Sequence, residues 1–104
     1  MTKYFVGCDV GTGSARAGLF DASGTLLASA SKDIQTWSAG ADIAEQSSAD
    51  IWAKLSACVR EVVAGVPAEA VAGIGFDATC SLVVVGANDD PVTVSEGGDD
   101  AQNI

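Results

Sequence analysis

The chain has 104 residues, of which 48% are hydrophobic and 18% are charged, proportions typical of one folded domain with a small core rather than of a disordered segment. Its formal net charge of −9, with no histidine, argues against binding to nucleic acid or to an anionic membrane surface. No apolar run is long enough for a transmembrane helix, and Met1-Thr2-Lys3 leads directly into a strand pattern instead of a signal peptide.

Three cysteines, Cys8, Cys58 and Cys80, are spread along the chain, and no two of them form a C-x-x-C pair. An odd number at such spacing predicts reduced, mostly buried thiols in a cytoplasmic protein. Because the chain has no histidine, it offers neither a Cys/His metal cluster nor a Cys-His or Ser-His-Asp catalytic arrangement. Cys80 is therefore predicted to be a small packing or ligand-facing residue and not a nucleophile.

The first two predicted strands, residues 4–10 and 15–20, are short apolar runs separated by a hairpin-sized gap. The gap is Gly11-Thr12-Gly13-Ser14, in which two glycines allow positive φ and a close approach to backbone N–H groups, and two hydroxyls add donors. Asp9 lies just before this turn and Arg16 just after it. Such a turn suits a phosphate chain, with the Asp9 carboxylate available for a hydrated Mg²⁺ ion.

An ordinary hairpin whose turn needs small residues explains the same composition equally well. Two other phosphate motifs are excluded. A Walker loop requires a lysine after its last glycine, and none follows here. A dinucleotide-binding fingerprint requires a third glycine at the position of Arg16 and then a helix, whereas this sequence continues as a strand.

A third strand, predicted at residues 25–32, completes an antiparallel meander. The turn before it ends at Gly24, which is placed to adopt a positive φ. Residues 34–48 lose periodicity and are predicted to form a loop.

A helix is predicted from an N-cap at Ser47 or Ser48 to about Ala64, and Gly65 and Pro67 end it. Its apolar residues recur every three or four positions, which predicts one stripe packed on the sheet. The residues of this stripe are Ile51, Leu55, Val59 and Val62, broadened by Trp52 and Val63.

The continuous apolar and glycine residues at 71–76 predict a central strand that is buried on both faces. Another strand is predicted at residues 82–85 and a turn at residues 86–91. Five acids and no base follow between positions 89 and 100, so residues 89–104 are predicted to be mobile and solvated.

The segment Asp9-Val10-Gly11-Thr12-Gly13-Ser14-Ala15-Arg16, followed by Phe20-Asp21, closely resembles the first phosphate motif of the FGGY carbohydrate kinases, a family of the actin and hexokinase superfamily of ATPases. Trp37 and the pair Glu45-Gln46 match an aromatic residue and an E-Q pair that precede a helix in this family. The resemblance covers nearly the whole chain. It implies an α/β fold, the N-terminal portion of an actin-like (ribonuclease-H-like) ATPase domain in the order β-β-β-α-β-β, and not the alternating βαβ of a dinucleotide-binding domain.

This resemblance implies transfer of a phosphoryl group from ATP, with Mg²⁺, to a hydroxyl group of a sugar or polyol. Asp9 would orient the Mg²⁺ ion through water. Arg16 would approach the transferred phosphoryl group, or it would brace the loop by pairing with an acid. The residues that would bind the ATP phosphates are Gly11, Thr12, Gly13, Ser14 and Arg16.

Polar residues directly after the strand at 71–76 lie at the edge of the sheet, where α/β proteins form ligand sites. A strand-to-strand turn that needs small polar residues also explains them. The resemblance favours sugar contact, because FGGY kinases follow a G-I-G-x sequence with residues that contact the sugar. The residues in that position here are Asp77, Thr79, Cys80 and Ser81. The string D-A-T-C-S is similar to the ribulokinase-like branch and unlike those of glycerol kinases and xylulokinases, so a pentulose such as ribulose, or a pentitol such as ribitol, is expected.

In this family the catalytic aspartate, the adenine site and the second phosphate motif lie beyond the region that residues 1–104 resemble. No catalytic base is therefore expected in this chain, and the base is expected downstream of Ile104. The chain is predicted to be the incomplete N-terminal part of the kinase N-terminal domain and to be inactive alone. Sugar and ATP are its expected small-molecule partners, and uncovered apolar surface would favour a homo-oligomer.

Two other functions stay open. One is a non-enzymatic, actin-like module that binds nucleotide to switch or assemble, and the other is a small acidic interaction module that retains the hairpin. The D-A-T-C-S string and the Trp37 and Glu45-Gln46 segment count against the first, because neither belongs to the actin pattern.

Overall fold

The structure of the chain, a computed structural model, describes residues 2–38, 44–79 and 82–90. The elements in these residues are β1 (Tyr4–Val10), β2 (Ser14–Asp21), β3 (Leu26–Asp33), β4 (Thr36–Ser38), β5 (Ala44–Gln46), α1 (Ser48–Val63), the 3-10 turn η1 (Ala68–Ala70) and β6 (Val71–Ala78).

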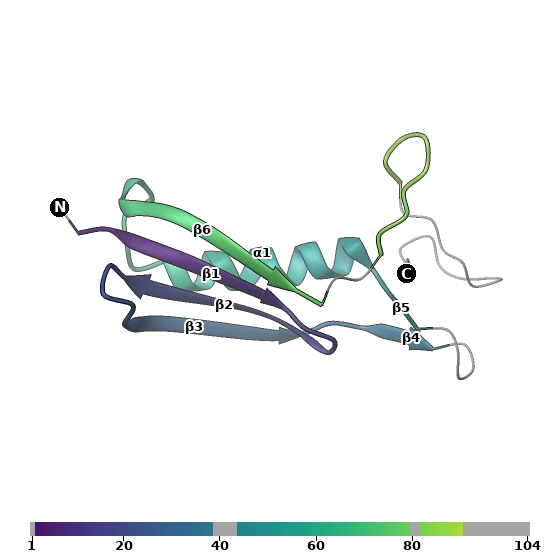
Figure 1. Cartoon of the computed structure of the whole chain (residues 1–104), viewed down its shortest axis with the longest axis horizontal. Coiled ribbons are helices and arrows are strands. Elements are labelled where there is room, and N and C mark those ends of the chain that lie inside the picture. Colours follow the sequence, from purple (N-terminus) through teal and green to yellow (C-terminus); the bar gives the residue numbers. More distant parts are fainter. Residues whose placement is uncertain (1, 39–43, 80–81, 91–104) are drawn as a thin grey trace.

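Four strands form one mixed sheet in the order β3-β2-β1-β6 (Figure 1). β1, β2 and β3 are the predicted antiparallel meander, and β6 pairs parallel to β1 after the crossover through α1. The chain therefore has the α/β architecture expected from its sequence. The carboxyl ends of β1 and β6 point to the same end of the sheet, and α1 begins at that end (Figure 1).

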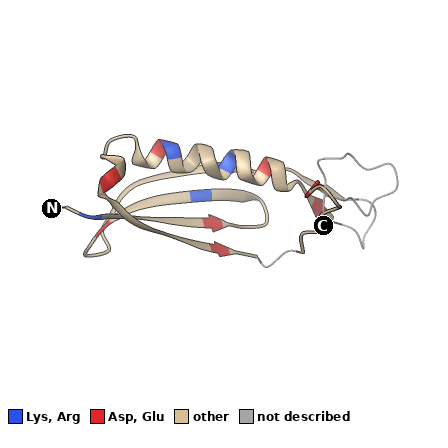
Figure 2. Cartoon of the chain, turned by 90° about the horizontal axis from the view of Figure 1, so that it is seen from above, with Lys and Arg blue, Asp and Glu red and all other residues tan. Residues whose placement is uncertain are grey.

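The core lies between one face of the sheet and α1, and Figure 2 shows the helix to one side of the sheet. Side chains alternate along a strand, so every second residue of β1 and β2 points to the helix. The buried cluster is Val6, Cys8, Ala15, Ala17, Leu19, Ile34, Leu55, Cys58 and Val62. The opposite face of β1 and β2 carries glycine, charged and phenylalanine residues, and no described helix covers it.

The helix begins where the sequence predicts, because the hydroxyl oxygen of Ser47 accepts the backbone N–H of Asp50 at 3.1 Å. Its buried residues include Cys58, which the predicted stripe omits and whose thiol donates to the carbonyl oxygen of Ala15 at 3.6 Å. Trp52 does not broaden the buried stripe, since it is 68% exposed. α1 packs mainly on β2 and β3, so the side of the helix that carries Trp52 has little sheet beneath it.

The prediction of a central, doubly buried strand at residues 71–76 is wrong for the described residues, in which β6 is an edge strand. Ile74 and Phe76 point to the helix side of the sheet but are 50% and 64% exposed, because α1 does not extend over β6. The strand predicted at residues 82–85 is also absent from the described structure, where only Val85 makes an isolated bridge. The turn after it forms, with the backbone N–H of Gly86 donating to the carbonyl oxygen of Asp90 at 2.8 Å.

The loop predicted at residues 34–48 contains a short hairpin instead, in which β4 and β5 pair antiparallel. Thr36, Trp37 and Ser38 face Gln46, Glu45 and Ala44 across this hairpin. Three residues are too few to show a periodic pattern, which is why the sequence did not reveal these strands.

Two further predictions concern the second turn and the end of the chain. The predicted positive φ of Gly24 is confirmed, at 86°. The segment predicted to be mobile, apart from residues 89 and 90, lies outside the described residues, as does its last residue, Ile104. Its mobility therefore stays a prediction.

Asp50 ties the segment after β3 to the first turn of α1. Its carboxylate accepts the backbone N–H of Gln35 at 3.0 Å and the ammonium group of Lys54 at 2.8 Å. These hydrogen bonds, the one from Lys54 foremost, hold the pKa of Asp50 below its ordinary value.

Asp50→Asn is therefore expected to lower the free energy of unfolding at neutral pH by about 1 kcal/mol. A depressed folded-state pKa stabilises the fold above the unfolded value of about 4, and this contribution is lost as the pH falls through the folded-state value. The variant should consequently lose less stability than the wild type as the pH falls from about 5 to about 2. Urea unfolding at several pH values checks this, with Glu61→Gln, an exposed carboxyl on the same helix, as control. Equal pH dependence for the wild type and Asp50→Asn would contradict it.

Candidate functional site

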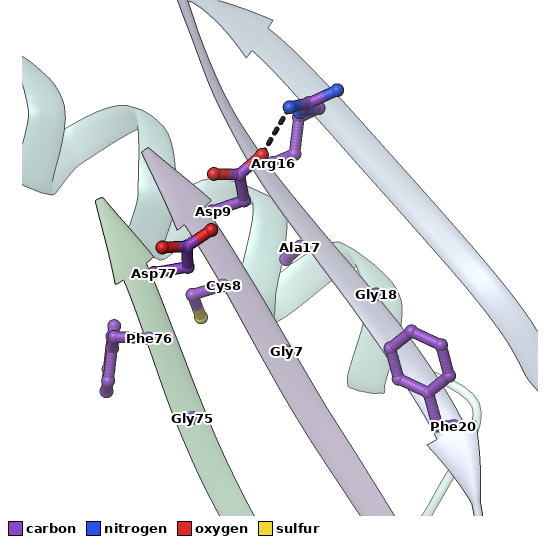
Figure 3. A pocket seen from close by; sticks show the side chains of 10 residues that line it. All are labelled: Gly7, Cys8, Asp9, Arg16, Ala17, Gly18, Phe20, Gly75, Phe76 and Asp77. Atoms are coloured by element: carbon purple, nitrogen blue, oxygen red, sulfur yellow. Dashed lines mark hydrogen bonds and ion pairs between the residues drawn. The ribbon is translucent and has the colours of Figure 1, made fainter. Parts of the chain in front are cut away.

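Three charged side chains come together at the end of the sheet where β1 and β6 finish. Asp9, near the end of β1, faces Arg16 on β2 and Asp77 on β6 as Cα partners. Since Cys8 points into the core, its neighbour Asp9 points to the open face, away from α1. Residues that are far apart in the sequence thus lie in one row across three strands (Figure 3).

A cavity of about 520 Å³ lies on this open face. Its residues are Gly7, Cys8, Asp9, Arg16, Ala17, Gly18, Phe20, Gly75, Phe76 and Asp77 (Figure 3). Glycines on three neighbouring strands make its floor flat. Phe20 lies across this floor away from the charged end, and a Cβ atom at Gly18 would meet its ring at 3.0 Å.

Arg16 forms an ion pair with Asp9, which is the second of the two roles expected for it (Figure 3). The pair is open to solvent, with 57% of the Arg16 side chain and 39% of the Asp9 side chain exposed. The guanidinium group orients one carboxylate oxygen of Asp9 and offsets part of the repulsion from the neighbouring Asp77. The site therefore has two carboxylates and one cation in a groove that a polar ligand can enter.

The turn after β1 differs from the prediction in its backbone conformation. Neither Gly11 nor Gly13 has a φ in the left-handed region, so positive φ is not the reason for glycine at these positions. The backbone N–H of Gly11 donates to the carbonyl oxygen of Ser14 at 2.9 Å and is used within the turn. A Cβ atom built at Gly13 meets nothing within 4 Å. The space beside Gly13 is therefore open, which leaves the backbone of the turn accessible.

The donor set fits a hydrated Mg²⁺ ion. Carboxylate and hydroxyl oxygens are hard ligands, and magnesium keeps several waters while one or two carboxylates and phosphate oxygens hold it. Asp9 and Asp77 supply two carboxylates side by side, with the Thr12 and Ser14 hydroxyls on the adjoining turn. No group of three or more His, Cys, Asp or Glu residues suited to a metal ion is found in the described part of the chain, so direct capture by protein ligands alone is not indicated there.

Of the four residues predicted to contact a sugar, the structure describes two, Asp77 and Thr79. Asp77 lies beside Asp9, and the backbone N–H of Thr79 donates to the carbonyl oxygen of Val10 at 3.2 Å, which carries the β1–β6 pairing to the start of the phosphate turn. Thr79 therefore lies next to that turn. Cys80 and Ser81 lie outside the described residues.

The catalytic base is expected downstream of Ile104, a residue that also lies outside the described ranges. The position of the base therefore stays a prediction.

Sequence reasoning missed two residues that hold the turn. The side-chain amide of Gln46 donates to the carbonyl oxygen of Thr12 at 2.8 Å, and the hydroxyl of Thr36 reaches the same oxygen at 3.5 Å. The Glu45-Gln46 pair matches a family pattern, but a segment predicted to be a loop offers no structural role for it.

The thiols of Cys8 and Cys58 are buried and free, as predicted. Burial, with a smaller effect of Cys58 nearby, raises the pKa of Cys8 above its ordinary value. A buried thiol that stays protonated is a poor nucleophile, which is consistent with a packing role for Cys8. Over the described ranges, no helix is both long enough and apolar enough to cross a membrane.

Comparison with known proteins gives one consistent result. Residues 4–96 match the N-terminal domain of the FGGY family of carbohydrate kinases. The chain is 47% identical over 102 residues to a human FGGY carbohydrate kinase domain-containing protein, a match that covers 98% of this chain and 18% of that protein. It is 54% identical over 87 residues to a D-ribulokinase of Saccharomyces cerevisiae, covering 82% of this chain and 12% of that enzyme.

Solved structures agree with the fold. A gluconate kinase from Lactobacillus acidophilus superposes with a TM-score of 0.81 at 26% identity, covering 89% of this chain and 19% of that chain. A xylulose kinase from the same organism gives a TM-score of 0.80 at 26% identity, covering 88% of this chain and 19% of that chain. The chain thus spans less than a fifth of the length of each of these relatives.

Proposed function

The chain belongs to the FGGY family of carbohydrate kinases, and from this premise we propose that the protein containing it transfers the terminal phosphoryl group of ATP to a hydroxyl group of a sugar or polyol. The observation that carries the proposal is the row of Asp9, Arg16 and Asp77 in one open cavity, directly beside the Gly11–Ser14 turn. Phosphoryl transfer depends on positioning and on charge neutralisation, and this arrangement offers groups for both.

The phosphate side of the site is the turn. Thr12, Gly13 and Ser14 bring backbone N–H groups and two hydroxyls to the phosphate chain, and the open space at Gly13 lets an oxygen approach the backbone. Arg16, which is paired with Asp9, would keep that carboxylate available for a bound magnesium ion, and it lines the cavity that a phosphoryl group would enter. The bound ion would neutralise phosphate charge as it builds in the transition state.

The sugar side is the end of β6. Asp77 and Thr79 adjoin the phosphate turn, so a hydroxyl group bound by them would be close to the phosphate that it receives. With Cys80 and Ser81 they form the string that is similar to ribulokinases, and the 54% identity to a D-ribulokinase supports a pentulose such as ribulose as the substrate. Ribitol is the related polyol. We assign no catalytic base to this chain and place the base downstream of Ile104, in the part of the kinase that the chain does not span.

A full-length kinase carrying this domain tests the proposal. Its kcat/KM should be measured for ribulose, xylulose, ribitol and glycerol with MgATP in a coupled assay for ADP. Ribulose or ribitol is expected to rank first. Binding of ATP without turnover of any of the four would support the non-enzymatic, actin-like alternative instead.

Thr79→Val in the same protein is expected to change this ranking, with a loss of about 10- to 100-fold for the substrates whose hydroxyl it binds. Thr79 is exposed in this chain, and the loss is expected once the complete site encloses the substrate, because a substrate hydroxyl without its partner is then left unpaired. Thr25→Val, at an exposed turn at the opposite end of β2 from the phosphate turn, is the matched control. An equal loss for all four substrates, or none, would remove Thr79 from the sugar site.

A further inference from the structure

The carbonyl oxygen of Thr12, in the middle of the phosphate turn, is held by two side chains of one cross-strand pair. Gln46 on β5 donates its amide at 2.8 Å, and Thr36 on β4 donates its hydroxyl at 3.5 Å. Only a donor satisfies a carbonyl oxygen, so the Gln46 amide nitrogen must point to Thr12. The shorter distance makes Gln46 the main anchor, since 3.5 Å is at the weak limit of a hydrogen bond.

This contact fixes the direction of a backbone donor. In a planar trans peptide the C=O and N–H groups point in opposite directions. With the Thr12 carbonyl aimed at Gln46, the N–H of Gly13 is aimed away from the β4–β5 hairpin. The next peptide is also held, because the carbonyl oxygen of Gly13 accepts the backbone N–H of Ile34 at 3.1 Å.

The central peptide of a four-residue turn is the one that flips between alternative turn types. Here it joins Thr12 to Gly13, neither of which has a positive φ in the structure. A flip would bring Gly13 to positive φ, which glycine accepts without strain. Glycine at position 13 therefore makes the flipped orientation of this peptide accessible. The hydrogen bond from Gln46 to the Thr12 carbonyl stabilises the observed orientation against that flip.

Gln46 is well placed to act as a fixed anchor. It lies between Glu45, which is 1% exposed, and Ser47, which is 1% exposed and caps α1. The first turn of α1 is in turn bonded to the segment before β4 through Asp50 and the backbone N–H of Gln35. The amide of Gln46 is thus carried by a buried connection between the small hairpin and the helix.

We propose that Gln46 is a positioning residue for nucleotide phosphates: by holding the Thr12 carbonyl it aims the Gly13 N–H at the phosphate chain. The inference rests on the proposed kinase function for its ligand, and the geometry of the turn gives it an independent basis. Gln46 itself touches no substrate. Its effect is on how often the turn is in the orientation that binds phosphate.

Gln46→Met removes the donor and keeps the length of the side chain. In the full-length kinase it should weaken ADP binding, measured by calorimetry without sugar, and raise KM for MgATP, each by about 5- to 10-fold, the effect of one ordinary hydrogen bond. The dissociation constant for the sugar should stay within about twofold, since β6 does not depend on this contact. Thr36→Val should show a smaller change in the same direction. Gln35→Met is the control, because that residue uses only its backbone N–H in a described contact.

Equal ADP affinity for the wild type and Gln46→Met would overturn the proposal. So would a parallel loss of ADP affinity, sugar affinity and melting temperature, which indicates a merely structural role. If the wild type binds ADP but phosphorylates no sugar, the proposed function fails, and the ADP comparison still decides the role of Gln46. If the wild type binds no ADP, both proposals fall.

Discussion

Asp9→Asn is expected to lower kcat of the full-length kinase by about 100- to 1000-fold, equivalent to about 3–4 kcal/mol in the activation barrier. Asparagine keeps the shape of the side chain but removes the charge that would orient the magnesium ion and the salt bridge that fixes Arg16. Both losses affect groups that we propose to act on the phosphates, so the effect is expected on the chemical step.

The same substitution should leave the fold intact. An exposed ion pair contributes about 0.2–1 kcal/mol, and the side chains of Arg16 and Asp9 are 57% and 39% exposed. Losing the Asp9 charge also removes its repulsion with Asp77, its Cα partner on β6. The expected cost to stability is therefore several times smaller than the expected cost to catalysis, and this difference separates a functional carboxylate from a structural one.

Steady-state kinetics and thermal unfolding of the same preparations test this prediction. Glu61→Gln is the control, because Glu61 is an exposed carboxylate near the C-terminal end of α1, whereas the helix begins at the end of the sheet that carries Asp9. Near-normal turnover by Asp9→Asn would remove Asp9 from the mechanism, and a similar loss in Glu61→Gln would point to a general effect of charge on the acidic chain.

The parts of the fold that the sequence predicted are those with a local signal. Alternation in the meander, glycine at the second turn and the serine cap of α1 each act within a few residues, and all three agree with the structure. The prediction for β6 was wrong because burial depends on what else covers a strand. The apolar residues of β6 are typical of a strand that other elements cover. In the described chain, however, α1 lies over β2 and β3, and no strand pairs with the free edge of β6.

In the candidate site, too, the sequence predicted the contacts that depend on neighbouring residues and not those that depend on distant strands. Asp9 and Arg16 flank a tight turn, so hairpin pairing necessarily places them opposite each other. That Asp77 joins them follows only from the parallel register of β6 on β1, which the sequence does not specify. The contact on which the proposed role of Gln46 rests could not be predicted, since it depends on a hairpin of three-residue strands that brings position 46 to position 12.

The 104-residue chain by itself is expected to phosphorylate no sugar. Phosphoryl transfer uses an enclosed site in which water is excluded and electrostatic interactions are strong. Here the cavity is a groove on one face of a single sheet, and its ion pair is exposed to solvent. The chain covers 18% and 12% of two relatives that share this domain, and we place the base and the adenine site in their remaining length. Nucleotide affinity of the chain alone should accordingly be about millimolar or weaker.

The isolated chain is also expected to self-associate in spite of its net charge of −9. Trp52, Ile74 and Phe76 are 68%, 50% and 64% exposed and line one apolar groove of about 220 Å³ between α1 and β6. Such a patch beside an edge strand favours contact between copies. Light scattering of the purified chain tests the association, and a coupled ADP assay with MgATP and several pentuloses tests the activity. Sustained turnover that is proportional to protein and absent from an Asp9→Asn control would show that one face of this sheet is a sufficient kinase site.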